Sequence, residues 1–327
     1  MNRRTWLVLL VCFGLVAVGL LAATSLGVKM IPVEIVWKSI FRYDGELDAM
    51  LVRDSRLPRA VCSALVGGML AMTGAIMQGI TRNPMAEPSL LGMTQGATLA
   101  VAIASVNMSV YGLLGNSLAA LLGAVASGAL VLLFSMQNVG RGGLSRLLMA
   151  GTAMSTFFLS LASMIALLGN RSRDLAFWLS GGFRTATWKS AWLLLAVACA
   201  GILLSLALSG RINILSLGDE AAAGLGVKPG RVRIQAVAVL IPLCAVCVAT
   251  AGNIAFVGLI VPHILRRLLG DDARRLIPMS FAGGAALLVW ADIAAKMANP
   301  PYELPIGLFS ALMGIPIFIA QVRRERT

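Results

Sequence analysis

Long apolar runs alternate with short polar segments along the whole chain. A helix that spans a membrane needs about 20 mostly apolar residues, and this pattern predicts about ten such helices. Their expected ranges are 6–27, 58–80, 90–106, 112–136, 146–169, 190–209, 233–251, 254–268, 276–295 and 304–321. The third and the eighth are short for a complete span. We therefore predict an all-α, polytopic membrane protein that forms a single transmembrane domain over residues 1–327.

The first apolar run has a second interpretation. Arg3 and Arg4 precede it and Ala22 and Ala23 lie near its end, an order that also occurs in cleaved signal peptides. The run is longer than the apolar core of a signal peptide, which has up to about 15 residues. No soluble domain follows it, so we interpret it as a retained helix.

Composition supports lipid as the solvent. Hydrophobic residues make up 58% of the chain and charged residues 13%, about half the charged share of a typical soluble domain. The net charge of +13 could indicate binding to nucleic acid. The basic residues, however, lie in short loops between apolar runs instead of on one face. Such loops are typical of membrane insertion.

The basic residues also predict an orientation. Ten spans place both termini on one side, and the loops on that side carry 16 of the 27 Lys and Arg residues, which leaves 11 for the other side. Because basic loops stay in the cytoplasm, we expect a multi-pass protein of the cytoplasmic (inner) membrane with both termini cytoplasmic.

Some positions inside the apolar runs predict packing. Small residues recur four apart, which lets helix backbones approach closely in lipid; they are Gly67, Ala71, Ala75 and Gly79, and then Ala119, Gly123 and Ser127. Gln78 and Asn253 are polar residues in apolar surroundings, and we expect them to form hydrogen bonds between helices. Cys244 and Cys247 lie within an apolar run, which favours core packing over redox or metal chemistry.

Several kinds of chemistry are not indicated. The sequence has no G-x-x-x-x-G-K-[ST] phosphate-binding loop, and its one histidine, His263, gives no metal motif. An ion-coupled carrier would need ionisable groups near the centre of the membrane. The best candidates, Asp292 and Lys296, are four residues apart and can pair on one helix face. A membrane-embedded enzyme would need a catalytic cluster, and we assign no catalytic residue and no metal site.

A series of motifs, in order along the chain, resembles a known family. The motifs are Arg56-Leu-Pro-Arg59, Gly67-Gly-Met-Leu-Ala-Met-Thr-Gly74, Arg82-Asn-Pro-Met-Ala-Glu-Pro88, Trp178-Leu-Ser-Gly-Gly-Phe183, Leu217-Gly-Asp-Glu-Ala-Ala-Ala-Gly-Leu-Gly226, Gly252-Asn-Ile-Ala-Phe-Val-Gly-Leu-Ile-Val-Pro-His263 and Glu303-Leu-Pro-Ile-Gly307. From about residue 50 to the C-terminus the chain resembles the FecCD family of ABC-importer permeases. Asn253 departs from the proline that is common in this family.

The resemblance implies an architecture and a set of partners. A family permease has ten helices and pairs with a second permease, identical or homologous, around a central path. Two cytoplasmic ATPase subunits bind ATP and Mg²⁺, so this chain needs no cofactor of its own, and an extracytoplasmic binding protein delivers the cargo. The expected cargo is a ferric siderophore; haem and vitamin B12 are alternatives.

The segment at 211–230 is the expected contact with the ATPase. Gly218 interrupts the chain before Asp219 and Glu220, which suit a helix N-terminus. Small residues follow, and they give a slim helix that can lie in a partner's groove. The resemblance implies that this segment couples the permease to ATP hydrolysis through Leu217, Gly218, Asp219, Glu220, Ala221, Ala222 and Gly226.

The remaining expected sites lie at the two mouths of the path. Positive charge on the outer side opposes the insertion bias, and the resemblance implies that Arg56, Arg59 and Lys296 hold acidic residues of the binding protein. The alternatives are contact with lipid headgroups and, for Arg59, a structural role at the start of a helix. At the cytoplasmic mouth the resemblance implies a gate formed by Asn83, Met85, Leu144 and Ser145.

Overall fold

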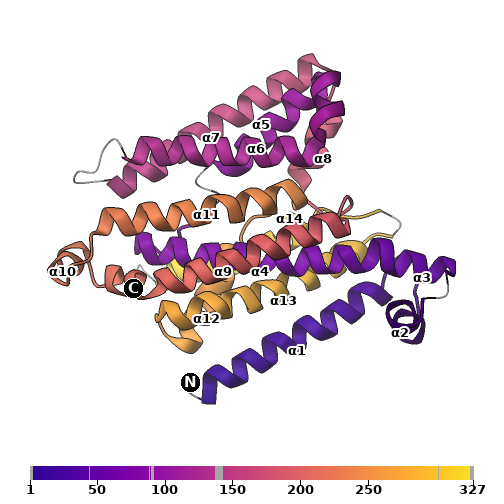
Figure 1. Cartoon of the computed structure of the whole chain (residues 1–327), viewed down its shortest axis with the longest axis horizontal. Helices are drawn as coiled ribbons and strands as arrows, with labels where there is room; N and C mark the ends of the chain where they lie inside the picture. The colour runs from indigo at the N-terminus through magenta and orange to yellow at the C-terminus, as the bar shows by residue number, and fades with distance from the viewer. Residues whose placement is uncertain are drawn as a thin grey trace.

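The computed structural model describes residues 3–43, 45–87, 89, 92–136, 143–300 and 302–324. The described chain folds into helices joined by turns and short extended links. Most of the long helices run along one common direction, which is horizontal in Figure 1. Within each helix the backbone N–H and C=O groups bond to each other, which is necessary in lipid because no water is there to bond them.

All ten expected spans correspond to helices. These are α1 (Arg3–Ser25), α4 (Leu57–Thr81), α5 (Met93–Val106), α6 (Met108–Met136), α7 (Gly143–Leu168), α9 (Trp188–Ser216), α11 (Pro229–Ala251), α12 (Val257–Leu269), α13 (Ala273–Met297) and α14 (Ile306–Arg324). Among the described residues, seven helices are long and apolar enough to cross a membrane, and α5 and α14 supply shorter apolar segments. The predicted all-α, polytopic fold is confirmed.

Five shorter elements were not separated by the apolar pattern, because each is too short to form a span. They are α2 (Val33–Phe41), α3 (Leu47–Leu51), the π-helical turn η1 (Val52–Arg56), α8 (Ser172–Ser180) and α10 (Asp219–Gly224). In Figure 1, α2 and α3 lie at one end of the bundle, and α10 lies at the other, near both chain termini. We call these the α3 end and the α10 end.

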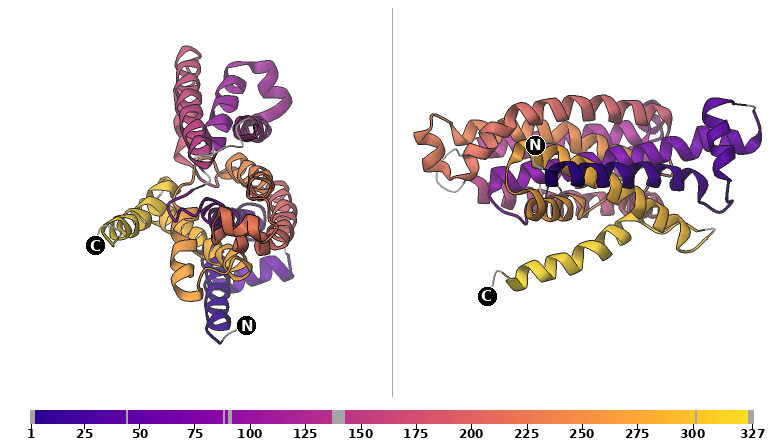
Figure 2. Two further views of the ribbon diagram at one scale, coloured as in Figure 1. Left: turned by 90° about the vertical axis from the view of Figure 1, so that its left-hand side faces the viewer. Right: turned by 90° about the horizontal axis from the view of Figure 1, so that it is seen from below.

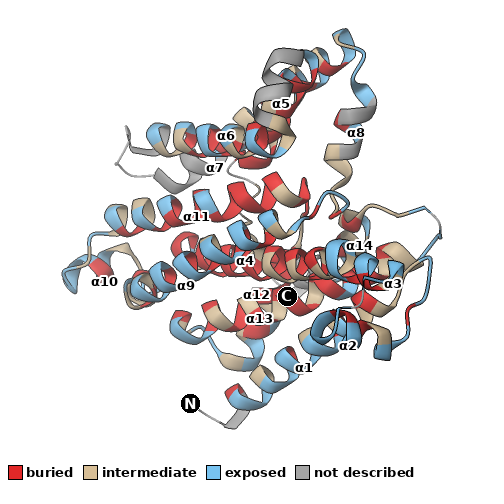
Figure 3. Ribbon diagram, turned by 45° about the vertical axis from the view of Figure 1, so that its right-hand side comes forward, coloured by how far each residue is buried: buried red, intermediate tan, exposed pale blue. Residues whose placement is uncertain are grey.

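Helix α4 runs through the centre of the molecule. It packs against α13, α9, α11 and α12, and Figure 3 shows it as the most continuously buried helix. Helices α1, α6, α7 and α9 turn large apolar side chains outward, as at Leu10 and Leu203. The end-on view in Figure 2 shows α5, α6 and α7 grouped on one side, while α14 extends away from the bundle. The outer helices thus present apolar faces to lipid or to a partner.

Glycine contacts bring α4 close to its neighbours. A Cβ at Gly67 would overlap the carbonyl oxygen of Gly284 on α13, and a Cβ at Gly74 would overlap that of Gly258 on α12. On the second stripe, Gly123 makes the same kind of contact with Gly96 on α5. The predicted packing role of the small-residue stripes is confirmed, because only glycine permits these approaches.

The expected short third and eighth spans are α5 and α12. They have 14 and 13 residues, and at about 1.5 Å per residue neither reaches across a hydrocarbon core of about 30 Å. Each follows a link that is not α-helical in its described residues, which are 82–87, 89 and 92 before α5 and 252–256 before α12. Irregular backbone at membrane depth is stable only where protein or a cavity surrounds it. These two links meet in the interior.

Candidate functional site

The expected coupling segment, residues 211–230, forms the end of α9, the helix α10 and the start of α11. Gly218 precedes α10 with φ of 118°, in a region of backbone conformation that favours glycine. Asp219 and Glu220 occupy the first turn, where acidic side chains are favoured. After α10, Gly226 has φ of 79° and turns the chain toward α11. The predicted short helix with an acidic start is therefore present.

The surface of α10 divides into an inner and an outer face. Ala222 is fully buried against the rest of the chain, whereas Ala221 and Ala223 are exposed. Leu217 and Leu225 flank the helix and are 67% and 63% exposed. Ala222, which the sequence placed among the contact residues, therefore supports α10 from inside. A partner at the α10 end would meet the outer alanines and the two leucines.

Asp219 connects α10 to two other elements. Its carboxylate accepts hydrogen bonds from Arg233 on α11, at 2.8 and 3.0 Å, and from Arg82 after α4, at 3.2 Å. Arg233 also donates to the carbonyl oxygen of Ile80 at 3.3 Å. One carboxylate thus joins the start of α10 to the end of α4.

Arg82 leads directly into the expected gate. Its φ of 51° ends α4, and the side-chain oxygen of Asn83 then accepts from the backbone N–H of Met85 at 2.9 Å. This turn fixes the loop locally. Leu144 and Ser145 lie in the first turn of α7, and their side chains are outside the described residues. The structure thus joins Asn83 and Met85 in one turn.

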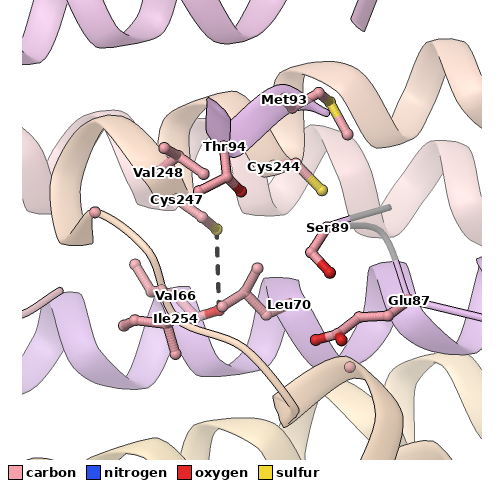
Figure 4. A pocket seen from close by; sticks show the side chains of 12 residues that line it. Val66, Leu70, Glu87, Ser89, Met93, Thr94, Cys244, Cys247, Val248 and Ile254 are labelled. Carbon is pink, nitrogen blue, oxygen red and sulfur yellow. Dashed lines mark hydrogen bonds between the residues drawn. The ribbon is translucent and has the colours of Figure 1, made fainter. Parts of the chain in front are cut away.

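Glu87 links the two irregular segments. Its carboxylate accepts a hydrogen bond from the backbone N–H of Phe256 at 2.7 Å, at the residue that precedes α12 with φ of 70°. Figure 4 shows Glu87 beside a small cavity between α4 and α11, near Leu70 and Cys244. Carboxylates within the apolar interior of a membrane protein are rare and commonly functional. Here the carboxylate satisfies a donor at the start of a buried half-length helix.

Other predicted interior residues form bonds between helices. Gln78 on α4 donates to the carbonyl oxygen of Gly258 at 3.2 Å and accepts from Arg266 at 2.8 Å, both on α12. Its predicted role is confirmed. Cys244 and Cys247 are buried free thiols on α11, and Cys247 contacts the carbonyl oxygen of Val66 in Figure 4. Their predicted place in the core is confirmed.

A charged cluster lies at the α3 end. Arg59 pairs with Asp292 and with Glu303, each at 2.8 Å, and Lys296 pairs with Asp292 at 2.8 Å. Arg184 pairs with Glu303 at 3.1 Å. We call these five residues the charge cluster. The expected pairing of Asp292 with Lys296 along one helix is confirmed. Arg59 has partners on α13 and in the link before α14, which supports a structural role.

Burial and charge oppose each other at Glu303, which lies in the link before α14. Partial burial disfavours the ionised carboxyl, but the hydrogen bonds and positive charge of Arg59 and Arg184 outweigh it. The pKa of Glu303 is therefore lowered from its ordinary value. Glu303 is ionised at neutral pH.

Arg56 and Arg53 have separate contacts at the α3 end. Arg56 donates to the carbonyl oxygens of Thr24 and Ser25, both at 2.9 Å, and so caps the end of α1. Arg53 is exposed and lies over the ring of Tyr43, 4.8 Å from its centroid. The three residues expected at the docking surface thus do not form one group. Arg59 and Lys296 belong to the charge cluster, whereas Arg56 supports the end of α1.

Sequence reasoning assigned no role to Arg184, Arg233, Glu87 or Glu303. Glu87 and Glu303 lay inside recognised motifs, and a carboxylate next to an apolar run was a usable signal. Arg184 and Arg233 gave no signal, because a single arginine at a helix end is common in membrane loops. Their partners are more than ten residues away, at 303 and 219.

Comparison of the fold defines the class of protein. A solved structure described as an inward-facing conformation of a metal-chelate type ABC transporter matches with a TM-score of 0.83, at 28% identity, over 97% of this chain and 98% of that one. The PsaBC structure from Streptococcus pneumoniae matches at 20% identity with a TM-score of 0.60, which shows a shared fold. The chain has the architecture of an ABC-importer permease, a membrane transport component.

Sequence comparison then gives the family. Residues 15–324 match the FecCD transport family, and the chain belongs to it. It is 40% identical to the iron(3+)-hydroxamate import system permease protein FhuB of Bacillus subtilis (strain 168), over 98% of this chain and 84% of that protein. It is 37% identical to the Fe(3+) dicitrate transport system permease protein FecC of Escherichia coli (strain K12), over 85% of each. The hemin permease HmuU of Yersinia pestis is 34% identical, over 83% of this chain and 82% of that one.

Proposed function

We propose that this protein is the permease subunit through which an ABC importer moves a ferric siderophore into the cytoplasm. The observation that carries the proposal is its membership of the FecCD family, together with 40% identity to an iron(3+)-hydroxamate permease over nearly the whole chain. Haem is the second candidate cargo, because the hemin permease is also similar, at 34% identity. Vitamin B12 as a cargo is supported by the family resemblance alone.

The proposed orientation puts the α10 end in the cytoplasm. Both chain termini lie toward that end in Figure 1, and the loops on that side carry most of the basic residues. The α10 segment would then face two ATPase subunits, which bind ATP and Mg²⁺. The α3 end would face an extracytoplasmic binding protein, and a second permease would complete the path.

The proposed mechanism is alternating access driven by the partner ATPase. Movement of α10 reaches the gate turn through Asp219, because this carboxylate holds Arg82 immediately before Asn83. Arg233 holds the same carboxylate to α11. The permease breaks no covalent bond itself; it couples the conformation of the ATPase to that of the path.

The docking role of Arg56, Arg59 and Lys296 remains part of the proposal. All three lie at the α3 end, and complementary charge sets the orientation and the rate of association of two proteins. Arg59 and Lys296 are largely buried and already paired. Docking therefore requires either the exposed edge of the charge cluster or a rearrangement within it.

The first test is to purify the tagged chain gently from its native membrane and to identify its partners by mass spectrometry. We expect an ABC ATPase in equal amount, and a second permease chain if the assembly is a heterodimer. Uptake of ⁵⁵Fe-labelled ferric hydroxamate into proteoliposomes should then require ATP and a binding protein. Uptake that follows a proton gradient without an ATPase would instead show an ion-coupled carrier.

A further inference from the structure

A cavity lies at the α10 end of the bundle, between the ends of α4, α9 and α12 and the start of α13. Its volume is about 360 Å³, whereas a water molecule in the liquid takes up about 30 Å³. Ile212 and Leu276 form part of an apolar inner wall. The guanidinium groups of Arg82 and Arg266 line the same cavity. An apolar wall beside two cations suits a ligand that has both an anionic and an apolar part.

The two arginines of the cavity pair with acids at the surface. Arg266 is held by the side chain of Gln78 at 2.8 Å, and it pairs with Asp271, whose side chain is 78% exposed. Arg82 pairs at 3.2 Å with Asp219, whose side chain is 43% exposed. Exposed ion pairs contribute little to stability, and a guanidinium has five N–H donors. An incoming anion can therefore bind these arginines without breaking a strong interaction.

A third cation lies beside the cavity, at the contact between α9 and α13. Arg274 on α13 is exposed, and a Cβ built on Gly210 of α9 would lie 3.2 Å from its Nη2 atom. Gly210 comes one turn before Asn213, which lines the cavity. The guanidinium of Arg274 thus lies over α9, close to the cavity.

An apolar stripe on α9 leads toward these cations. Leu203 and Leu206 are 69% and 39% exposed. Together with Gly210 and Asn213 they follow one another at spacings of three or four residues, so all four lie on one face of the helix. An acyl chain can lie along the leucines while its headgroup reaches Arg274 and the cavity. A small soluble anion would make no use of such a stripe.

We propose that this cavity binds the phosphate headgroup of an anionic glycerophospholipid from the cytoplasmic leaflet. Arg266 and Arg274 hold the phosphate, and α9 holds an acyl chain. The inference rests on the proposed orientation, which puts the α10 end in the cytoplasm. The cytoplasmic leaflet carries anionic lipids, and basic pockets between helices on that side suit their headgroups.

The test is a lipid titration of the complete permease–ATPase complex in neutral detergent, followed by native mass spectrometry. We expect the first phosphatidylglycerol to bind at least about tenfold more tightly than phosphatidylcholine, whose choline cation opposes the arginines. Arg274→Gln and Arg266→Gln should each weaken this binding by about tenfold, the size of one charge-assisted hydrogen bond. Arg231→Gln makes the same charge change at an exposed position at the start of α11 and should change the binding less than twofold.

Arg274→Gln decides the outcome, because this side chain is exposed and its loss leaves the bond between Arg266 and Gln78 in place. Binding of phosphatidylglycerol by Arg274→Gln as tight as that of the wild type would overturn the site. Glycerol 3-phosphate separates the two sources of phosphate: if it displaces phosphatidylglycerol at equal concentration, the cavity binds a soluble anion and the assignment to lipid is wrong.

Assembly and transport are measured on the same preparations. A wild-type complex that contains the ATPase and takes up its cargo with ATP, but binds the two lipids equally, would contradict only this inference. A chain that purifies without an ATPase would contradict the proposed function instead.

Discussion

Charged side chains inside this protein are stabilised by specific partners. Asp292 lies between Arg59 and Lys296, and Glu87 accepts from the backbone of Phe256. Isolated charges in a low dielectric are costly, and removing one partner of a buried pair costs more than the pair contributes. These residues therefore act in groups, and a single substitution changes the environment of the whole group.

Asp272 gives the clearest prediction at the residue scale. Its side chain caps α13 through the backbone N–H of Arg274 at 3.0 Å, and Asn213 donates to it at 2.7 Å. Asp272→Ala should lower the free energy of unfolding by about 1 kcal/mol, the usual cost of losing an N-cap. Thermal unfolding in detergent measures this. The neighbouring Asp271, whose side chain is 78% exposed and pairs with Arg266, provides the control Asp271→Asn, with an expected change below about 0.5 kcal/mol.

The stabilisation by Asp272 also depends on pH. The hydrogen bond from Asn213 lowers the pKa of Asp272 from its ordinary value of 3.8, against a smaller opposing effect of burial. A carboxyl with a lowered pKa in the folded state stabilises the protein above the ordinary pKa, and this contribution disappears as the pH falls through the lowered one. The difference between wild type and Asp272→Ala should be complete at pH 6 and shrink below about pH 4. A constant difference down to pH 2.5 would contradict this assignment.

At the scale of elements, two features determine how the helices pack: glycines where helices approach closely, and two short helices that begin inside the bundle. Helix α4 meets α13 and α12 where glycines face each other. Helices α5 and α12 begin inside the bundle, after links whose backbone groups need partners. The link between Glu87 and Phe256 shows how one carboxylate satisfies such a group.

Gly67→Ala tests the contact between α4 and α13. The added methyl would overlap the carbonyl oxygen of Gly284 and the side chain of Leu288, so we expect a loss of about 1–3 kcal/mol in the free energy of unfolding. Gly14→Ala is the matched control, because a methyl on this α1 glycine would meet nothing within 4 Å. Its unfolding temperature should be unchanged or higher, since alanine favours helices. Equal unfolding temperatures for the two variants would disprove tight packing at Gly67.

At the scale of the whole molecule, the two ends of the bundle carry different charge networks. Asp219 joins α10 to the end of α4 and the start of α11, while the charge cluster joins α4, α13 and the links before α9 and α14. Helix α4 belongs to both networks and lies at the centre, so it connects the two ends directly.

Asp219→Asn should separate ATP hydrolysis from transport. The change weakens the bonds to Arg82 and Arg233 but leaves the exposed surface of α10 in place. We expect ATPase activity of the assembled complex within about twofold of wild type and uptake reduced by about tenfold, the effect of losing one charge-assisted interaction. Both rates are measured in the same proteoliposomes. Glu220→Gln removes the next charge on the same helix and is the control. If it reduces uptake as much as Asp219→Asn does, the negative charge of α10 acts in docking of the ATPase and not through the bonds to Arg82 and Arg233.

The sequence predicted the elements well and the contacts poorly. The lengths of the apolar runs predicted ten spans, because a helix that crosses lipid must be apolar over about 20 residues. The short helices α5 and α12 were already visible as short apolar runs. The ordered motifs predicted the family and the short helix within residues 211–230. The interior position of Ala222 could not be predicted, because alanine suits both faces of a helix. The partners of Arg59 could not be predicted either, since they lie 233 and 244 residues further along the chain.

The sequence by itself determined a polytopic, all-helical membrane protein of the FecCD family. Hydrophobicity, helix length and small-residue spacing act locally, and each can be seen within a window of about 20 residues. Only the tertiary structure decided that Asp219 bonds to Arg82, that Glu87 supports α12 and that Glu303 bridges Arg59 and Arg184. Several acids and bases could have paired in each case, and helix packing chose among them by bringing distant segments within hydrogen-bonding distance.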